Sequence, residues 1–136
     1  MNITLNKIDS FVENLAEKFI DLGGAGLTLA LTNTAHTASW DELADLTQIS
    51  YTNLSSRAVT VTSSSQTGGL YKLILQQVVL TASGVVPTWE FIYLYDDAST
   101  GKKLIGYADW GSAVNMNTGD SVTLTFDAVN GAISIQ

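Results

Sequence analysis

Two apolar segments, Phe91-Ile92-Tyr93-Leu94-Tyr95 and Leu104-Ile105-Gly106-Tyr107, flank the polar run Asp96-Asp97-Ala98-Ser99-Thr100-Gly101. Aromatic and β-branched residues favour strands, whereas Asp, Ser and Gly favour tight turns. This stretch therefore predicts a β-hairpin whose loop ends near Gly101.

Similar strand signals occur on both sides of this hairpin. Leu27–Thr32 alternates leucine with threonine or alanine, which is the period of a half-buried strand. Residues 58–63, 70–81 and 89–95 are also rich in β-branched and aromatic residues, with turn-like runs between them. Pro87 precedes the last of these segments, where a strand can begin.

Two further turns are predicted towards residue 136. Asn117-Thr118-Gly119-Asp120 has the composition of a turn, and Asn130-Gly131 lies between two strand-like segments, 122–126 and 132–135. Asn-Gly favours a type I′ turn because both central residues of that turn need a positive φ. We therefore expect the final segment to be a β-hairpin.

One amphipathic helix is predicted over residues 8–22. Its apolar residues recur at steps of three and four, and they would pack on the sheet through Phe11, Leu15 and Phe19. Ser10 and Glu13 have the spacing of a capping box, and Gly23-Gly24 can end the helix. An alternative is that the helix binds a partner. Ser39 and Glu42 repeat the capping spacing and predict a short helical turn through residue 46.

Composition limits the classes of function. The chain has 136 residues, 14% of them charged, a net charge of −7, and no cysteine. Its six lysines and arginines argue against direct contact with DNA or RNA, and the absence of cysteine excludes disulfides and zinc-thiolate sites. No signal peptide or membrane-spanning segment is evident, so we expect the chain to be made and kept in the cytosol unless lysis releases it.

These patterns predict one domain over residues 1–136, mostly β, built as an antiparallel β-sandwich or barrel with the single N-terminal amphipathic α-helix.

Catalytic chemistry has little support in the sequence. His36 is the only histidine, and neither it nor nearby Ser39 lies in a known nucleophile motif. Gly23-Gly24-Ala25-Gly26 follows the predicted helix, which is the wrong order for a phosphate-binding loop. We therefore predict no catalytic, cofactor-binding or metal-binding residues, and no enzyme activity.

Two groups of residues offer weaker binding hypotheses. Asp96-Asp97 is the densest local pair of carboxylates, but it lacks the order of a calcium loop and fits a hairpin turn better. An aromatic cluster could instead stack a sugar ring if it is exposed, although aromatic residues of sheets mostly pack in the core. This cluster consists of Trp89, Tyr93, Tyr95, Tyr107 and Trp110.

Several stretches resemble small structural proteins of tailed bacteriophages, of the type that decorates the capsid as cement. They begin at Phe11-Val12-Glu13-Asn14-Leu15-Ala16-Glu17 and end at Asp127-Ala128-Val129-Asn130-Gly131. Between these lie Leu29-Ala30-Leu31-Thr32-Asn33-Thr34-Ala35, Tyr51-Thr52-Asn53-Leu54-Ser55-Ser56-Arg57, Ser63-Ser64-Ser65-Gln66-Thr67-Gly68-Gly69 and Leu104-Ile105-Gly106-Tyr107. The motifs are structural and carry no diagnostic chemistry.

The resemblance implies a β-rich virion protein that binds the outer surface of the assembled capsid and stabilises it without catalysis. Its partner would be the major capsid protein, and the chain would form a homo-oligomer, with a trimer favoured by capsid symmetry. It would be made in the host cytoplasm and would contact neither nucleic acid nor membrane. The alternative is a carbohydrate- or receptor-binding module of a phage tail or fibre, and the residues alone do not distinguish a head location from a tail location.

Overall fold

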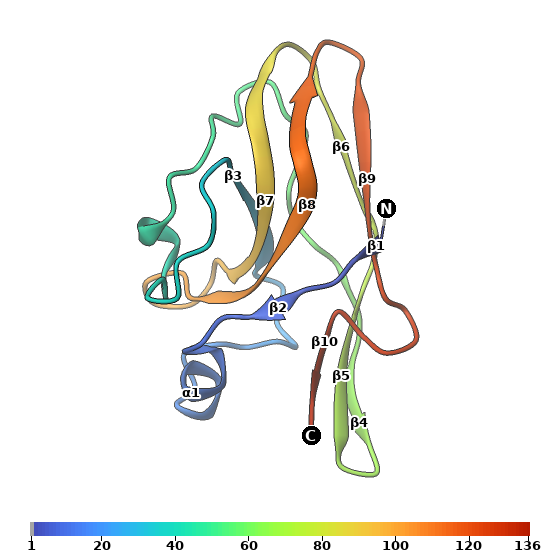
Figure 1. Cartoon of the computed structure of the whole chain (residues 1–136). Helices are drawn as coiled ribbons and strands as arrows, with labels where there is room; N and C mark the ends of the chain where they lie inside the picture. The colour runs from blue at the N-terminus through green and yellow to red at the C-terminus, as the bar shows by residue number, and fades with distance from the viewer. Residues whose placement is uncertain (1) are drawn as a thin grey trace.

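The computed structural model describes residues 2–136 and is mostly β, with one short α-helix and one 3-10 helix (Figure 1). The helices are α1 (Phe11–Ala16) and η1 (Leu43–Asp45). The strands are β1 (Asn2–Ile3), β2 (Asn6–Lys7), β3 (Leu27–Thr32), β4 (Val61–Thr67), β5 (Leu70–Leu75), β6 (Val78–Thr81), β7 (Val86–Asp96), β8 (Leu104–Met116), β9 (Ser121–Phe126) and β10 (Ile133–Ile135).

The strands form three sheets, with the orders β2-β8-β7-β3, β1-β9-β6 and β10-β5-β4. All strand pairs are antiparallel except β1 with β9. Apolar residues from all three sheets join one hydrophobic core. The predicted mostly β, antiparallel class is confirmed, and within residues 2–136 no sheet closes into a barrel.

The β7–β8 hairpin is the central pair of the four-stranded sheet, as its sequence predicts. Its register shifts between Trp89 and Phe91. Trp89 pairs with Val114 and Phe91 pairs with Asp109, so residues 110–113 of β8 lie opposite the single residue Glu90. Gly111 lies in this bulge with φ +93°, a conformation that glycine adopts without strain. Residues 111–113 are exposed there.

A long segment, residues 33–60, here called the covering segment, runs along the free edge of β3 and packs His36 and Trp40 against Tyr93 of β7. Thr32 donates its hydroxyl hydrogen to the carbonyl of Thr47, and Leu29 N–H donates to the carbonyl of Arg57. In β3 every residue except Thr28 is buried, instead of every second one. The half-buried strand predicted over Leu27–Thr32 is thus a strand covered on both faces.

The predicted helix over residues 8–22 is wrong in extent, because α1 ends at Ala16. Lys18 adopts φ +68°, its N–H donates to Leu15, and Phe19 N–H donates to Asn14, which together form a Schellman motif. Beyond it, the N–H of Asp21 donates to the side chain of Asp96. Tertiary hydrogen bonding thus replaces the helix that the apolar periodicity favours, and Gly23-Gly24 only connects to β3.

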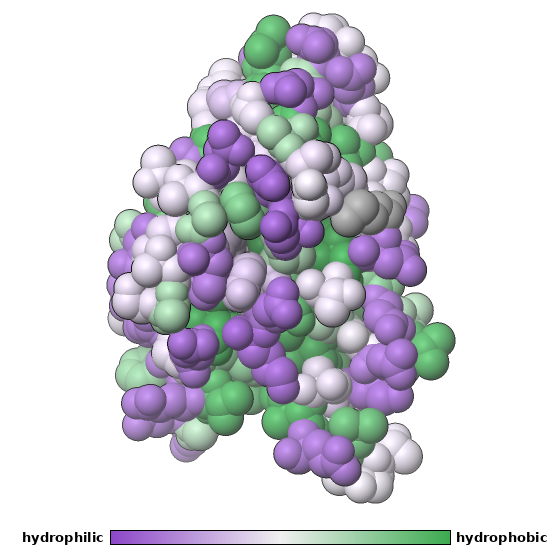
Figure 2. Space-filling view, in the orientation of Figure 1, coloured by the Kyte–Doolittle hydropathy of each residue, from purple (hydrophilic) through white to green (hydrophobic). Residues whose placement is uncertain are grey.

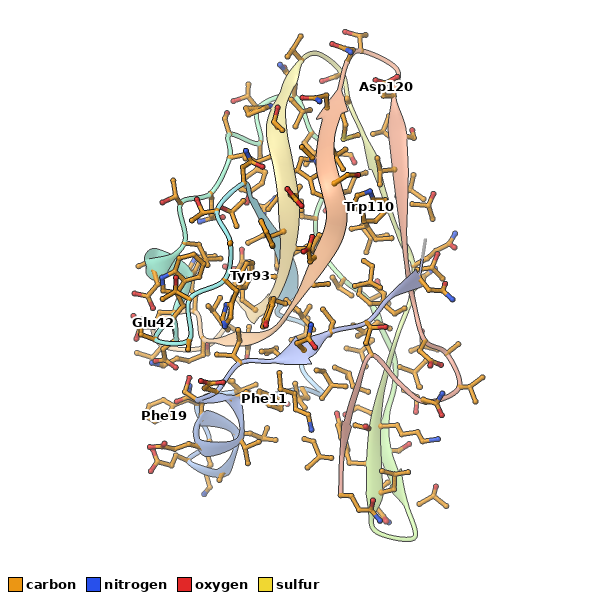
Figure 3. All side chains as sticks on the ribbon, in the orientation of Figure 1. Phe11, Phe19, Glu42, Tyr93, Trp110 and Asp120 are labelled. Atoms are coloured by element: carbon orange, nitrogen blue, oxygen red, sulfur yellow. The ribbon has the colours of Figure 1, made fainter. Side chains whose placement is uncertain are left out.

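The cap and packing of α1 also differ from expectation. Ser10 makes no side-chain hydrogen bond to the helix backbone, since its hydroxyl donates to Asp41. Phe11 is completely buried and Leu15 is partly buried, but Phe19 remains 43% exposed. Figure 3 shows Phe19 on the outer side of the α1 region, with Phe11 on the side facing the sheets. The prediction that the helix packs on the sheet through Phe19 is therefore wrong.

The predicted C-terminal hairpin is also wrong. β9 pairs with β6 and β1, whereas β10 pairs with β5. Gly131 has φ +91°, but Asn130 lacks the positive φ that a type I′ turn needs. Asp127 instead accepts hydrogen bonds from the N–H groups of Val129 and Asn130, and this turn directs the chain to a different sheet.

Candidate functional site

The outer face of sheet β1-β9-β6 forms an extended uncharged surface, here called the hydroxyl face. Its residues are Asn2, Ser55, Val79, Thr81, Ser121, Thr123 and Thr125. Ser55 joins the edge of β6, where its hydroxyl accepts a hydrogen bond from the N–H of Thr81. The hydroxyls of Thr81 and Ser121 lie 3.1 Å apart across the pair. No member carries a charge.

Strand alternation produces this face. Val78 and Leu80 point into the core from β6, so Val79 and Thr81 point outward. In β9, Leu124 and Phe126 are buried and Val122 packs against the core, so Ser121, Thr123 and Thr125 point to the other side of the strand. A regular antiparallel register keeps the pair β6–β9 free of bulges. The result is a flat surface that can offer hydroxyl hydrogen bonds and the 46% exposed Val79 to a protein partner.

A second surface feature is a groove of about 390 Å³ between the α1 region and the β4–β5–β10 sheet. Leu15, Ile20, Leu22, Tyr71 and Ile135 supply most of its apolar lining. Figure 2 shows hydrophobic residues between the helical corner and the hairpin at the bottom of the view. The hydroxyls of Tyr71 and Ser64 lie 2.7 Å apart at the groove.

The aromatic cluster predicted as a possible sugar platform is mostly core. Trp89, Tyr93 and Tyr95 are buried, and only Tyr107 and Trp110 are partly exposed. Trp89 meets Trp110 edge to face at 5.7 Å. Sugar stacking needs exposed aromatic faces, so three of the five rings are not free for it.

His36 lies in the covering segment and packs onto this cluster. Its ring stacks on Tyr107 at 3.9 Å, and its Nδ1 is 3.0 Å from the hydroxyl of Tyr93. Trp40 contacts the same ring edge to face. Figure 3 places Tyr93 between β7 and the part of the covering segment that carries Glu42. Within residues 2–136, no hydrogen bond joins His36 to Ser39.

Burial lowers the pKa of His36 below its ordinary value of 6.5, although the carboxylate of Asp9 opposes the shift. Burial also raises the pKa of Tyr93, with Tyr107 adding to the effect. Both shifts favour the neutral forms. The stacking of His36 on Tyr107 and its contact with the Tyr93 hydroxyl fit a histidine that anchors residues 33–48 to the sheet.

The depressed pKa of His36 predicts that the protein loses stability as the pH falls. Above about pH 6.5 histidine is neutral in both states; below it the unfolded chain takes up the proton more readily, so the free energy of unfolding decreases. Urea denaturation at about pH 7.5 and about pH 5.5 should show this decrease, and His36→Gln should reduce it. An equal decrease in the variant would contradict the assignment, since the carboxylates would then account for all of it.

Asp96 and Asp97, the predicted turn carboxylates, have different surroundings. Asp96 is only 2% exposed and accepts hydrogen bonds from the N–H groups of Asp21 and Ala98. Asp97 is exposed and forms an ion pair with Lys102 at 2.9 Å. No group of three metal-ligating side chains occurs in the described part of the chain. The pair belongs to the hairpin turn.

A polar network that the sequence did not predict joins α1, the covering segment and the β7–β8 hairpin. Asp41 accepts hydrogen bonds from Ser10, Asn14 and Lys103, and Lys103 also binds Glu42 at 2.7 Å. Burial raises the pKa of Asp41, but these hydrogen bonds outweigh it and lower the pKa overall. Its partners are 27 to 62 residues away in sequence, so no local motif could reveal it.

In comparisons with known proteins, no protein-family model matches this sequence, and no curated protein or solved structure shows significant similarity to it. No helix within residues 2–136 is both long and apolar enough to span a membrane.

Proposed function

We propose that the chain is a phage virion structural protein of the capsid-decoration type. It binds the major capsid protein on the outer surface of the assembled capsid and stabilises the shell without catalysis. The observation that carries this proposal is the hydroxyl face, because a cement protein needs an extended, flat contact area rather than a converging site. We also propose that the two sheets β1-β9-β6 and β2-β8-β7-β3 form a β-sandwich around the core.

The chemistry of the hydroxyl face suits permanent contact between proteins. Buried charges cost several kcal/mol each unless they are paired, and this face has none to desolvate. Its serine and threonine hydroxyls both donate and accept hydrogen bonds, so they can match the backbone groups of many partner surfaces. Charge depletion at the centre of an interface is also typical of stable complexes.

The alternative, a carbohydrate- or receptor-binding module of a tail or fibre, has less support. Its predicted platform is Trp89 to Trp110, and most of those rings pack in the core or, like Tyr107, lie under His36. A capsid-binding role therefore remains the proposal, with the virion surface as the location.

A single lysine on the hydroxyl face should weaken binding to capsids. Thr123→Lys introduces a charge at the centre of the uncharged area, and its desolvation on docking should weaken binding by at least about tenfold. Heads stripped of the protein should release DNA at a lower temperature than heads decorated with wild type. Adding the variant to stripped heads should not raise the release temperature to that of wild-type heads.

Ser112→Lys provides the matched control, because Ser112 is exposed in the β8 bulge away from this face. It should restore head stability like wild type. Equal rupture temperatures for stripped and decorated heads would contradict the capsid role. Specific binding to a glycan array, lost on changing Trp110 to alanine, would favour the alternative.

A further inference from the structure

The turn that follows β9 carries the only Asn-Gly pair of the chain, Asn130-Gly131. Asn130 is exposed, and Figure 1 shows the connection between β9 and β10 projecting from the side of the molecule. Asparagine is one of the chemically labile residues of proteins, and a glycine after it has no side chain to obstruct the approach of its backbone nitrogen. The pair is therefore a candidate for spontaneous deamidation.

The reaction at such a pair needs only water and hydroxide. The backbone nitrogen of Gly131 gives its proton to hydroxide and forms a bond with Cγ of Asn130. The bond from Cγ to the side-chain nitrogen breaks, and this nitrogen takes up a proton from water and leaves as ammonia. Water then opens the resulting cyclic succinimide at either carbonyl, which gives aspartate or isoaspartate. The net change consumes water, releases ammonia and replaces a neutral amide with a carboxylate.

In the closed turn, Asp127 holds both reacting groups away from this path. Its backbone carbonyl accepts a hydrogen bond from the N–H of Gly131 at 3.1 Å, so the proton that must leave is engaged. Its carboxylate accepts hydrogen bonds from the N–H of Asn130 at 2.8 Å and from the side-chain amide of Asn130 at 2.9 Å. A reaction that needs these bonds broken proceeds from the open turn, at a rate set by the open fraction.

The same turn fixes the position at which β10 meets β5. Gly131 has φ +91°, and a Cβ there would lie 3.0 Å from the carbonyl oxygen of Ile133 and 3.2 Å from that of Leu73. Ala132 donates its N–H to the carbonyl of Leu73 at 2.8 Å. This close fit leaves little space for a displaced backbone.

Both products of deamidation disturb this arrangement. Isoaspartate inserts an additional carbon into the main chain before Gly131, so the N–H groups of Gly131 and Ala132 move away from their acceptors. Aspartate keeps the main chain, but it replaces the amide that donates to Asp127 with a second carboxylate. Like charges at such a distance repel one another.

We propose that Asn130 is a deamidation site that Asp127 protects in the closed turn, and that its conversion in the open turn prevents the turn from closing again. The change is not reversed, because the ammonia is lost. β10 then loses the connection that docks it on β5, and β4–β5 remains as a two-stranded hairpin, which is marginally stable by itself. The inference goes beyond the proposed function and does not depend on the capsid partner.

Incubation in mildly alkaline buffer, followed by peptide mapping with mass spectrometry, tests the site and its protection. In guanidinium chloride, Asn130 should convert to aspartate and isoaspartate, while Asn33 and Asn117, which precede threonine, stay largely intact. In the folded chain, conversion of Asn130 should be at least about tenfold slower. No conversion in the unfolded chain would remove the site, and equal rates in the two states would overturn its protection by the turn.

The role of Asp127 has its own variant. Asp127→Ala removes the carboxylate that holds Asn130, so conversion in the folded chain should accelerate by roughly tenfold or more. Asp97→Ala, which removes an exposed carboxylate from another turn, should convert at the wild-type rate. If Asp127→Ala does not fold by circular dichroism, Asp127→Asn keeps the shape with a neutral acceptor and takes its place. A rate equal to that of wild type would overturn the role of Asp127.

The consequence for the turn is tested with the aspartate product itself. Asn130→Asp should lower the melting temperature by roughly 3 °C or more, because a carboxylate replaces the amide donor beside Asp127. Asn33→Asp makes the same charge change at an exposed residue of the covering segment, and it should melt like wild type. Equal melting of these two variants would overturn the claim that deamidation keeps the turn from closing.

Discussion

Replacing Phe11 by alanine is expected to lower the free energy of unfolding by about 3–5 kcal/mol. Phe11 is completely buried, and it is the residue through which the short helix α1 enters the hydrophobic core. Removing a buried ring loses its transfer free energy and leaves a cavity that the surrounding residues fill only in part. Urea denaturation followed by circular dichroism measures the loss through the shift in midpoint.

Phe19→Ala is the matched control, because the same ring is removed at a site that is 43% exposed. It should cost no more than about 1 kcal/mol, since much of the ring already contacts water. The ammonium group of Lys103 lies 5.8 Å from the centre of the ring. If Phe19→Ala proved as costly as Phe11→Ala, the placement of α1 would be wrong.

The second large effect is expected from Asp96→Ala, at about 2–4 kcal/mol. The buried carboxylate accepts hydrogen bonds from Asp21 N–H at 2.9 Å and from Ala98 N–H at 3.1 Å. The first of these bonds ties the segment after α1 to the central hairpin. Alanine would remove both hydrogen bonds, and hydrogen bonds to a charged group contribute more than neutral ones, about 1.5–3 kcal/mol. Thermal and urea denaturation should both report the loss.

Its neighbour Asp97 again allows a close comparison. Asp97→Ala removes only the exposed ion pair with Lys102, and such pairs contribute about 0–1 kcal/mol. High salt should reduce even that contribution. A loss for Asp97→Ala equal to that for Asp96→Ala would show that the turn depends on charge rather than on buried hydrogen bonds.

Local sequence predicted those parts of the fold that local interactions determine. The β7–β8 hairpin formed where aromatic strands flank a polar run, and Asn117 to Asp120 formed a turn closed by a 2.9 Å hydrogen bond. Composition also predicted a turn over residues 64–69, but only Gly68 and Gly69 form it, because residues 64–67 belong to β4. In each case the residues that make the structure are close in sequence.

Contacts between distant residues account for the errors. Asp96 lies 75 residues from Asp21, and its acceptance of that N–H helps to hold the chain out of the helix that the apolar periodicity predicted. Asn130-Gly131 has the sequence of a type I′ turn, but β10 finds a better partner in β5. Periodicity alone also cannot show that residues 33–60 cover β3, because this covering segment has little regular structure.

The hydroxyl face was not predicted from the sequence. Low charge content is compatible with such a surface, and strand alternation supplies its hydroxyls. Which of those hydroxyls share one face depends on the pairing of β9 with both β1 and β6, and a parallel pair between residues 2–3 and 125–126 has no local signal.

That parallel pair has a consequence for how the chain acquires its structure as it leaves the ribosome. Ile3 can pair with Phe126 only after more than a hundred intervening residues have been made, so β1 stays unpaired until β9 has been synthesised. The β7–β8 hairpin, in contrast, can close as soon as its own residues emerge. Distant pairings also slow folding. We therefore expect the hairpin to form early and the β1–β9 and β10–β5 pairings to form late, with the apolar side of the nascent sheet exposed to chaperones in the interval.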